Sequence, residues 1–144
     1  MHADLRSLLL ECGAIVRRDH PALRGRIDAA VKRGELIPVL PGVFVQAGIE
    51  LDWRLHALAA CAYHPDVVIT GKSAAALGGL FPGKTVQQVS AYHRECVRGT
   101  GPVVWHRNPV PPQWRIERGG LRYAAPAWAA VEVAGSGEAD SLDE

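Results

Sequence analysis

The fold of the first third of this chain is decided by Gly13–Val45, GAIVRRDHPALRGRIDAAVKRGELIPVLPGVFV. After Pro21, apolar residues recur at i, i+4, i+7 and i+8, the spacing of one helix face; they are Leu23, Ile27, Ala30 and Val31, with Leu36 as a further candidate. Pro21 suits the first turn of a helix, because its missing N–H would have no partner there. Gly34 is the natural C-terminal stop, so the sequence predicts a helix between these two residues.

A hairpin is predicted directly after this helix. Ile37–Val39 and Val43–Val45 alternate in polarity or are β-branched, and Pro41-Gly42 between them is typical of a tight turn. Upstream, Asp4–Cys12 carries apolar residues at helical spacing. The order helix, short helix, helix, hairpin predicts a winged helix-turn-helix over about residues 1–48.

The apolar pattern changes after Ala47-Gly48, where we place a boundary. The elements predicted beyond it are a helix at Leu51–Tyr63, a strand at Val67–Thr70, a helix at Ser73–Leu80, strands at Val86–Tyr92 and Val103–Arg107, a hairpin of Trp114–Glu117 and Leu121–Tyr123 around Gly119-Gly120, a helix at Pro126–Val133 broken by Gly135-Ser136-Gly137, and the start of a polar helix at Glu138–Glu144. The predicted fold class is therefore α+β, with a winged helix at 1–48 followed by a small α/β domain at 49–144.

Composition narrows the class of protein. Sixteen Lys+Arg against fifteen Asp+Glu give a net charge of +1, and 48% of the residues are hydrophobic, as in an ordinary globular protein rather than a basic nucleic-acid coat. The longest apolar run near the start, Leu8–Leu10, is too short for a signal peptide, and no stretch approaches a membrane span. The three cysteines are widely spaced and odd in number, which is typical of reduced thiols. We expect a cytoplasmic protein without a membrane partner.

Positive charge gathers around the helix that follows Pro21. Between residues 15 and 35 there are six cations and three acidic residues, a local balance of 6 − 3 = +3. The cations, all candidate DNA contacts, are Arg17, Arg18, Arg24, Arg26, Lys32 and Arg33. The second helix of a helix-turn-helix enters the major groove, where arginine suits guanine edges and phosphates alike. Arg24, in the first turn, is best placed for base edges, whereas Lys32 and Arg33 are better placed for phosphates.

Two other interpretations of this region stay open. Charged helix faces are often only solvated, and winged helices also serve as protein-interaction modules. The hairpin tip, Leu40-Pro41-Gly42, has no cation, so we expect at most a weak contact from it.

Three segments carry a resemblance to a known family. Gly13–Val45 contains a basic helix, then R-G-x-L, then a hairpin that ends in P-G-V-F. Ile69–Leu80 reads ITGKSAAALGGL, and Gly120–Ala127 reads GLRYAAPA. These segments resemble the winged helix, the S-x-x-S-A-A-x-L-x-G-L segment and the G-L-x-V-T-x-P-x-R-T hairpin of the AbiEi-type antitoxin family of actinobacteria. The chain departs from that pattern at Lys72 and at Ala127-Trp128-Ala129.

The resemblance implies a function and partners. Family members are similar to autorepressors that bind inverted repeats of double-stranded DNA in their own promoter and neutralise a nucleotidyltransferase-type toxin. It implies that the six cations named above contact DNA, and it is consistent with a homodimer on DNA. Family-like chains normally continue further, and some carry a Vsr-like nuclease domain, so a second unit truncated at its C-terminus is an open alternative.

Several chemistries do not fit the sequence. Gly71-Lys72-Ser73 lacks the glycine that a phosphate-binding loop needs five positions earlier, where Asp66 stands. No acidic residue has Lys two positions on, as a restriction-type nuclease requires. The His and Cys residues, His56, Cys61, His64, His93 and Cys96, match no common zinc-finger spacing. We expect no enzymatic activity, no cofactor and no metal.

The leading hypothesis is a sequence-specific DNA-binding antitoxin and repressor. The competing hypotheses are a protein-interaction module without specific DNA binding, and a non-catalytic fragment of a Vsr-like endonuclease-superfamily protein.

Overall fold

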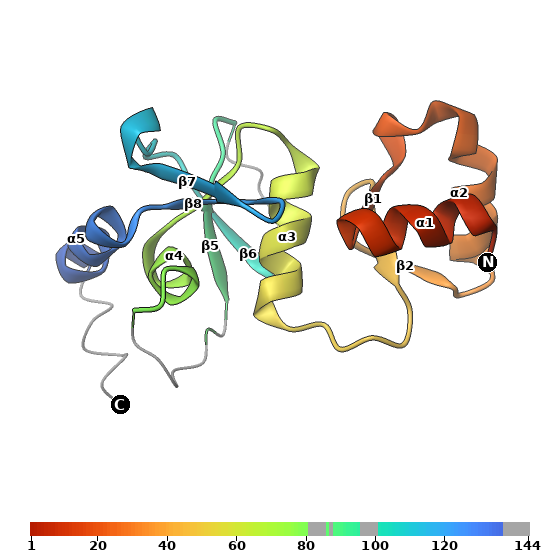
Figure 1. The fold of residues 1–144 in the computed structure, drawn as a ribbon, viewed down its shortest axis with the longest axis horizontal. Helices are drawn as coiled ribbons and strands as arrows, with labels where there is room; N and C mark the ends of the chain where they lie inside the picture. Colours follow the sequence, from red (N-terminus) through yellow and green to blue (C-terminus); the bar gives the residue numbers. More distant parts are fainter. Residues whose placement is uncertain (81–85, 87, 96–100, 137–144) are drawn as a thin grey trace.

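A computed structural model of the protein describes residues 1–80, 86, 88–95 and 101–136. Within these residues the chain has an α+β fold with five α-helices, a three-stranded sheet and a five-stranded sheet. The α+β fold class predicted from the sequence is thus confirmed. Figure 1 shows the N-terminal elements, in red and orange, beside a larger unit that contains the second sheet.

The N-terminal elements surround the three-stranded sheet. They are α1 (Ala3–Cys12), β1 (Ile15–Val16), the 3-10 turns η1 (Arg17–Asp19) and η2 (Pro21–Leu23), α2 (Arg24–Lys32), β2 (Leu36–Leu40) and β3 (Val43–Gln46). The strand order is β1-β3-β2 and both pairs are antiparallel. The predicted hairpin is present, and two 3-10 turns occupy the place of the short helix. That this unit is a winged helix stays a prediction.

The helix expected after Pro21 is shorter than its apolar spacing suggested. Pro21 opens η2, and the α-helix itself begins at Arg24. At the other end Gly34 takes a positive φ of 76°, which turns the chain out of the helix. Leu36 therefore opens β2 instead of extending the helix, although it packs into the same buried cluster as Ile27.

The second sheet has five strands in the order β6-β5-β4-β8-β7. The elements are α3 (Trp53–Tyr63), β4 (Val68–Ile69), α4 (Gly71–Leu77), β5 (Val89–Tyr92), β6 (Val103–His106), η3 (Pro112–Trp114), β7 (Arg115–Arg118), β8 (Leu121–Ala124) and α5 (Pro126–Ser136). The β4–β8 and β5–β6 pairs are parallel, and the other two pairs are antiparallel. The sheet lies between α3 on one side and α4 with α5 on the other (Figure 1).

Two predicted helices in this unit have other boundaries in the structure. The helix predicted at Ser73–Leu80 is α4, which begins at Gly71 and ends at Leu77. The expected break at Gly135-Ser136 does not occur, because α5 continues through Ser136. A glycine inside a helix costs about 1 kcal/mol relative to alanine, which lowers helix stability without forbidding the helix. The polar helix predicted at Glu138–Glu144 lies outside the described residues.

Helix α3 contributes to two hydrophobic cores. Ala57 and Ala60 belong to the core of the five-stranded sheet, whereas Ala59 packs with Val43 and Val45 of the small sheet. These three alanines are small and fully buried, which lets both sheets approach the helix closely. The division of the chain near residue 48 stays a prediction about domains, but apolar packing is continuous across it.

The C-terminal end of α3 is held by an arginine from the β7–β8 hairpin. Arg122 Nη2 donates to the carbonyls of Cys61 at 2.6 Å and His64 at 2.9 Å, and its Nε donates to the carbonyl of Val67 at 3.0 Å. The last carbonyls of a helix have no partner within the helix, so a guanidinium that reaches several of them fixes the helix end. This contact ties α3 to β8 independently of the core.

Candidate nucleic-acid interface

Helix α2 has one buried face and one exposed face. Ile27 and Ala30 are fully buried, which points the opposite side of the helix to solvent. Arg24, Gly25, Asp28 and Lys32 are exposed, and we call these four residues the outer face of α2. At about 100° per residue, the i, i+4, i+8 spacing of its three charged residues places them along one stripe.

The carboxylate in the middle of this stripe is neutralised by an arginine from η1. Arg17 Nε lies 3.1 Å from Asp28 Oδ1, and Arg17 Nη2 lies 3.0 Å from Asp28 Oδ2. The hydrogen bonds from Arg17 hold the pKa of Asp28 below its ordinary value, and those to Asp28 raise the pKa of Arg17. Asp28 is thus kept ionised and paired, which reduces its repulsion of an approaching anion.

The other two charged residues of the outer face are less engaged, and Arg24 acts on Asp28 only through its charge, which helps to lower the pKa of that carboxyl. Neither Arg24 nor Lys32 makes an ion pair or a side-chain hydrogen bond with any residue that the structure describes. Both side chains are exposed. Taken with the Arg17–Asp28 pair, the stripe holds three cations and one carboxylate, a net charge of 3 − 1 = +2. This is the part of the predicted interface that is most open to an anionic ligand.

Two further predicted contacts are engaged in surface ion pairs. Arg26 Nη1 lies 3.1 Å from Asp4 Oδ2 of α1, and Arg33 Nε lies 3.2 Å from Glu35 Oε1. Both arginines are more than half exposed. Ion pairs between exposed groups contribute little, on the order of 0–1 kcal/mol, so exchanging the carboxylate for a phosphate would meet little resistance.

Arg18 faces the larger unit. Its Nη2 donates to the carbonyl of Tyr63 at the end of α3, and its Nε lies 3.6 Å from Asp19 Oδ1. Together with His64 and Arg122 it lines an open hollow of about 550 Å³ between the two units. The structure brings the other five predicted cations together around α2 and gives Arg18 a partner elsewhere; a role for Arg18 in DNA binding stays a prediction.

The hairpin tip is tied to η1 rather than extended. The backbone N–H of Arg17 donates to the carbonyl of Gly42 at 2.9 Å. Gly42 has a φ of 74°, which favours glycine in this turn. Pro41 and Gly42 are exposed. The tip therefore presents backbone and a proline ring, but no charge, beside the outer face of α2.

The acidic partners of the arginines were missed by sequence reasoning. Asp28 is one of the three acidic residues between positions 15 and 35, and Asp4 opens the helix predicted at Asp4–Cys12, but neither position predicts its partner. Their pairings with Arg17 and Arg26 span 11 and 22 positions, so no local spacing rule indicates them. The Arg33–Glu35 pair, two positions apart, is the one that sequence could have suggested.

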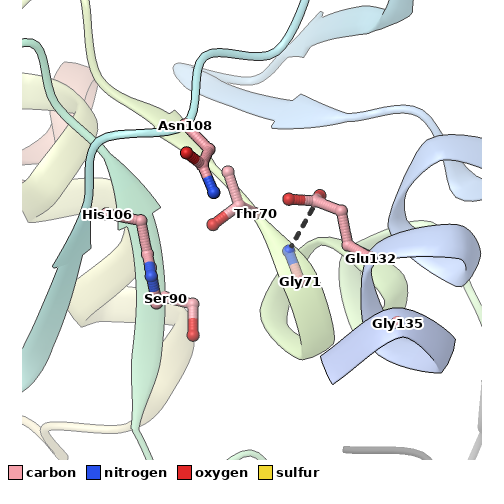
Figure 2. Close-up of a pocket in the computed structure, with 7 residues that line it drawn as sticks. All are labelled: Thr70, Gly71, Ser90, His106, Asn108, Glu132 and Gly135. Carbon is pink, nitrogen blue, oxygen red and sulfur yellow. Dashed lines mark hydrogen bonds between the residues drawn. The ribbon is translucent and has the colours of Figure 1, made fainter. Parts of the chain in front are cut away.

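A second polar site lies in the larger unit, away from α2. A hollow of about 310 Å³, which we call the Thr70 pocket, is lined by Thr70, Gly71, Ser90, His106, Asn108, Glu132 and Gly135 (Figure 2). The N–H of Gly71 donates to Glu132 Oε1 at 3.3 Å, which joins the start of α4 to α5. Sequence analysis missed this pocket, because its residues come from four separate segments of the chain.

The phosphate-loop-like segment and the cysteine and histidine residues have other surroundings in the structure. Gly71-Lys72-Ser73 begins α4, with Gly71 at a φ of 56°. Among the described residues there is no group of three or more His, Cys, Asp and Glu arranged to hold a metal ion. Cys61 Sγ instead accepts from the N–H of Arg122 at 3.4 Å. Cys96 lies outside the described part of the chain.

No protein-family model matches the chain, and no curated protein sequence matches it. Within the described ranges, no helix has both the length and the apolar character needed to cross a membrane.

Proposed function

We propose that this protein binds double-stranded DNA in a sequence-specific manner, with α2 as the helix that enters the major groove. On this proposal it represses its own promoter as the antitoxin of a toxin–antitoxin pair, acts in the cytoplasm, and has a nucleotidyltransferase-type toxin as its protein partner. Residues 1–48 would then be a winged helix. The antitoxin role rests on the resemblance of the three sequence segments, and the DNA-binding role rests on α2.

The observation that carries the proposal is the exposure of Arg24 and Lys32 on one stripe of α2, where neither makes an ion pair or a side-chain hydrogen bond with a described residue. Residues eight positions apart in a helix are separated by about 12 Å along the axis, which is close to the width of the major groove. With its first turn in the groove, α2 would bring Arg24 to the base edges and Lys32 to a phosphate at the rim. Gly25 adds no side chain between them, and a Cβ there would meet no atom within 4 Å.

The test is a fluorescence-anisotropy titration of the full chain on DNA from upstream of its own gene, with random DNA as the reference. We expect tighter binding to the upstream DNA and a loss of about 10-fold or more in affinity for Arg24→Glu. Arg118→Glu is the matched control, because Arg118 is exposed on β7, far along the chain from α2. Equal affinity for both DNAs, or equal losses for the two variants, would contradict the proposal.

A second candidate function is supported by α5. Its exposed positions Ala127, Ala130, Val131 and Ala134 follow the spacing i, i+3, i+4, i+7, and Val131 is 73% exposed. An apolar helix face of this kind is typical of a surface that binds another protein. In the interaction-module hypothesis, Val131→Asp abolishes binding to the purified toxin while Arg24→Glu leaves it unchanged. The affinity for DNA would show the reverse pattern, with a loss for Arg24→Glu and no change for Val131→Asp.

A further inference from the structure

We propose that the hollow between the two units binds a phosphate group, which accepts hydrogen bonds from Arg18 of the N-terminal unit and from Arg122 and His64 of the larger unit. The hollow, of about 550 Å³, is lined by η1, by the C-terminal end of α3 with the two residues after it, and by β8. We call it the interunit hollow. This inference does not depend on DNA binding by α2. It rests on the approach of two guanidinium groups, on their remaining hydrogen-bond donors and on the charge of the lining.

The C-terminal end of α3 brings the two guanidinium groups together. Arg18 Nη2 donates to the carbonyl of Tyr63, the last residue of the helix. Arg122 Nη2 donates to the carbonyl of the following residue, His64, at 2.9 Å. Because the two acceptors belong to consecutive residues, two like charges from different units are held near one another, and each disfavours the other electrostatically.

The positive charge of the interunit hollow is only partly offset. The C-terminus of a helix carries about half a negative elementary charge, and Asp19 adds one carboxylate to the lining. Arg18 Nε lies 3.6 Å from Asp19 Oδ1, and both side chains are more than half exposed, so this ion pair contributes little. With His64 counted as neutral, the formal charges of the lining residues sum to 2 − 1 = +1. An anion between the two guanidinium groups would reduce their repulsion.

Each guanidinium group keeps an N–H donor that no described residue uses. Arg122 donates to backbone carbonyls through Nε and Nη2, and its Nη1 makes no hydrogen bond with a described residue. The same holds for Nη1 of Arg18. His64 adds a third donor, because its Nδ1 accepts from the N–H of Asp66 at 3.1 Å, so the proton of the neutral ring lies on Nε2.

These donors favour a phosphate group over other anions. A guanidinium group presents its N–H donors in one plane and binds the oxygens of phosphate or carboxylate in pairs. A carboxylate has two coplanar oxygens, whereas the oxygens of a phosphate are arranged tetrahedrally and can accept from three side chains at once. The phosphate can be free or can belong to the DNA backbone, because Arg18 directly follows Arg17, which pairs with Asp28 of α2.

The test is a titration of the full chain with inorganic phosphate at constant pH and ionic strength, with sodium chloride as the balancing salt. Long-range proton–nitrogen correlation NMR spectra report on each histidine ring. We expect the His64 resonances to shift and saturate, with half-saturation below about 10 mM. His2, at the start of α1 and outside the lining, is the internal reference and should show no saturable shift. No saturable shift at His64, or parallel shifts of both rings, would overturn the proposal.

Three variants locate the phosphate. Arg18→Gln removes one guanidinium group and should weaken binding about fivefold or more, whereas Asp19→Asn removes the competing carboxylate and should strengthen it about twofold or more. Arg118→Gln makes the same change of charge on β7, outside the lining, and should leave the affinity unchanged. Arg122 stays unaltered, because it also holds the end of α3. Equal affinities for Arg18→Gln and Arg118→Gln, with unchanged circular dichroism spectra, would refute the assignment.

A second titration distinguishes the two sources of phosphate, and it alone rests on the proposed DNA binding. The affinity of Arg18→Gln for the upstream DNA is measured by anisotropy at several salt concentrations. A salt dependence weaker by about one charge would assign the site to the DNA backbone, and an unchanged salt dependence would assign it to a free phosphate. If the unaltered chain shows no specific DNA binding, the proposed function fails while the histidine titration still decides this inference.

Discussion

Arg17 donates hydrogen bonds to both carboxylate oxygens of Asp28, with its Nε 3.1 Å from Oδ1 and its Nη2 3.0 Å from Oδ2. The two residues come from η1 and α2, so the pair joins the segment before the proposed recognition helix to the outer face of that helix. The pair also sets the net charge of that face, because Arg17 neutralises the Asp28 carboxylate, which lies between Arg24 and Lys32.

Breaking this pair from its two sides should change DNA affinity in opposite directions. Arg17→Gln leaves Asp28 unpaired beside the phosphates and should weaken binding. Asp28→Asn releases Arg17 to contact a phosphate and should strengthen binding, with a salt dependence steeper by about one charge. Anisotropy titrations at several salt concentrations measure both effects. A change in the same direction for the two variants would show that the pair does not control the charge of this face.

Two glycines with different surroundings should respond oppositely to alanine. Gly13 has a φ of 77°, and a Cβ there would lie 2.7 Å from Leu58 Cδ2. Gly13→Ala should lower the free energy of unfolding by about 1–2 kcal/mol from backbone strain alone. Gly25→Ala, in an exposed helix with open space around it, should raise that free energy by up to about 1 kcal/mol. Urea unfolding checks both, and a destabilised Gly25→Ala would contradict the open surroundings described for α2.

Removing the guanidinium of Arg122 should destabilise the larger unit. Arg122→Ala leaves the carbonyls of Cys61, His64 and Val67 without their donor, and we expect a loss of about 2–4 kcal/mol in the free energy of unfolding. Arg122→Lys should recover only part of this free energy, because an ammonium group cannot reproduce the planar arrangement of donors in a guanidinium. Arg118→Ala, an exposed residue on the same hairpin, should change stability little. A similar loss for Arg118→Ala would assign the effect to charge rather than to the helix end.

The free energy of unfolding should fall as the pH drops below about 6.5, because His93 becomes protonated. Its ring is buried, its Nδ1 accepts from the N–H of Glu95 at 3.2 Å, and its Nε2 has no hydrogen-bond acceptor among the described residues. Burial lowers the pKa of His93 below 6.5, and neighbouring His64 lowers it further, against smaller opposing effects of Glu95 and Asp66. The folded state therefore prefers the neutral ring, so stability is complete above the unfolded pKa and declines as pH falls toward the folded pKa.

Urea midpoints at pH 7.5, 6.5 and 5.5 measure this dependence, since these values bracket the ordinary histidine pKa of about 6.5. His93→Gln should flatten the curve. His56 contributes in the same direction, because burial lowers its pKa as well, with Asp52 opposing. His56→Gln is therefore the companion variant. A full pH dependence in the double variant would place the titrating group elsewhere.

The two described cysteines should differ in reactivity. Cys12 is exposed, whereas Cys61 is buried in the core of the five-stranded sheet. Burial raises the pKa of the Cys61 thiol, which lowers the fraction of reactive thiolate. In a Cys96→Ser background, we expect one fast thiol in a disulfide-exchange assay of the folded protein and a second only in urea. Two fast thiols without denaturant would mean that this core opens readily.

Elements with strong local signals were predicted well from the sequence. Gly34, with its positive φ, ends a helix where the sequence predicted, by chemistry that acts within a few residues. Asp52 caps α3, which begins at Trp53, two residues after the predicted start at Leu51. Leu36 was a candidate for the helix face because its spacing fits that face, but Gly34 has already ended the helix and Leu36 opens β2. Gly135 led to the opposite error, because a break was predicted there and the helix continues past it. Helix propensity is a weak preference that tertiary packing can override.

The sites depend on contacts that no local pattern contains. The sequence indicated which cations surround α2, but not that Arg17 and Arg26 are held by Asp28 and Asp4. It gave no sign of the Thr70 pocket, because strand order alone brings β4, β5 and β6 together. Polar residues at strand ends, such as Thr70, are the only signal that could have suggested it.

The position of α3 between the two sheets has a thermodynamic consequence. Ala59 shields Val43 and Val45, and Leu58 lies against both Gly13 and Gly120, so neither unit can lose its structure without exposing apolar surface of the other. Heat should therefore melt the chain in one cooperative transition, with calorimetric and van't Hoff enthalpies that agree. A peptide cut at residue 48 would keep every predicted DNA contact and yet lack the helix that stabilises their arrangement.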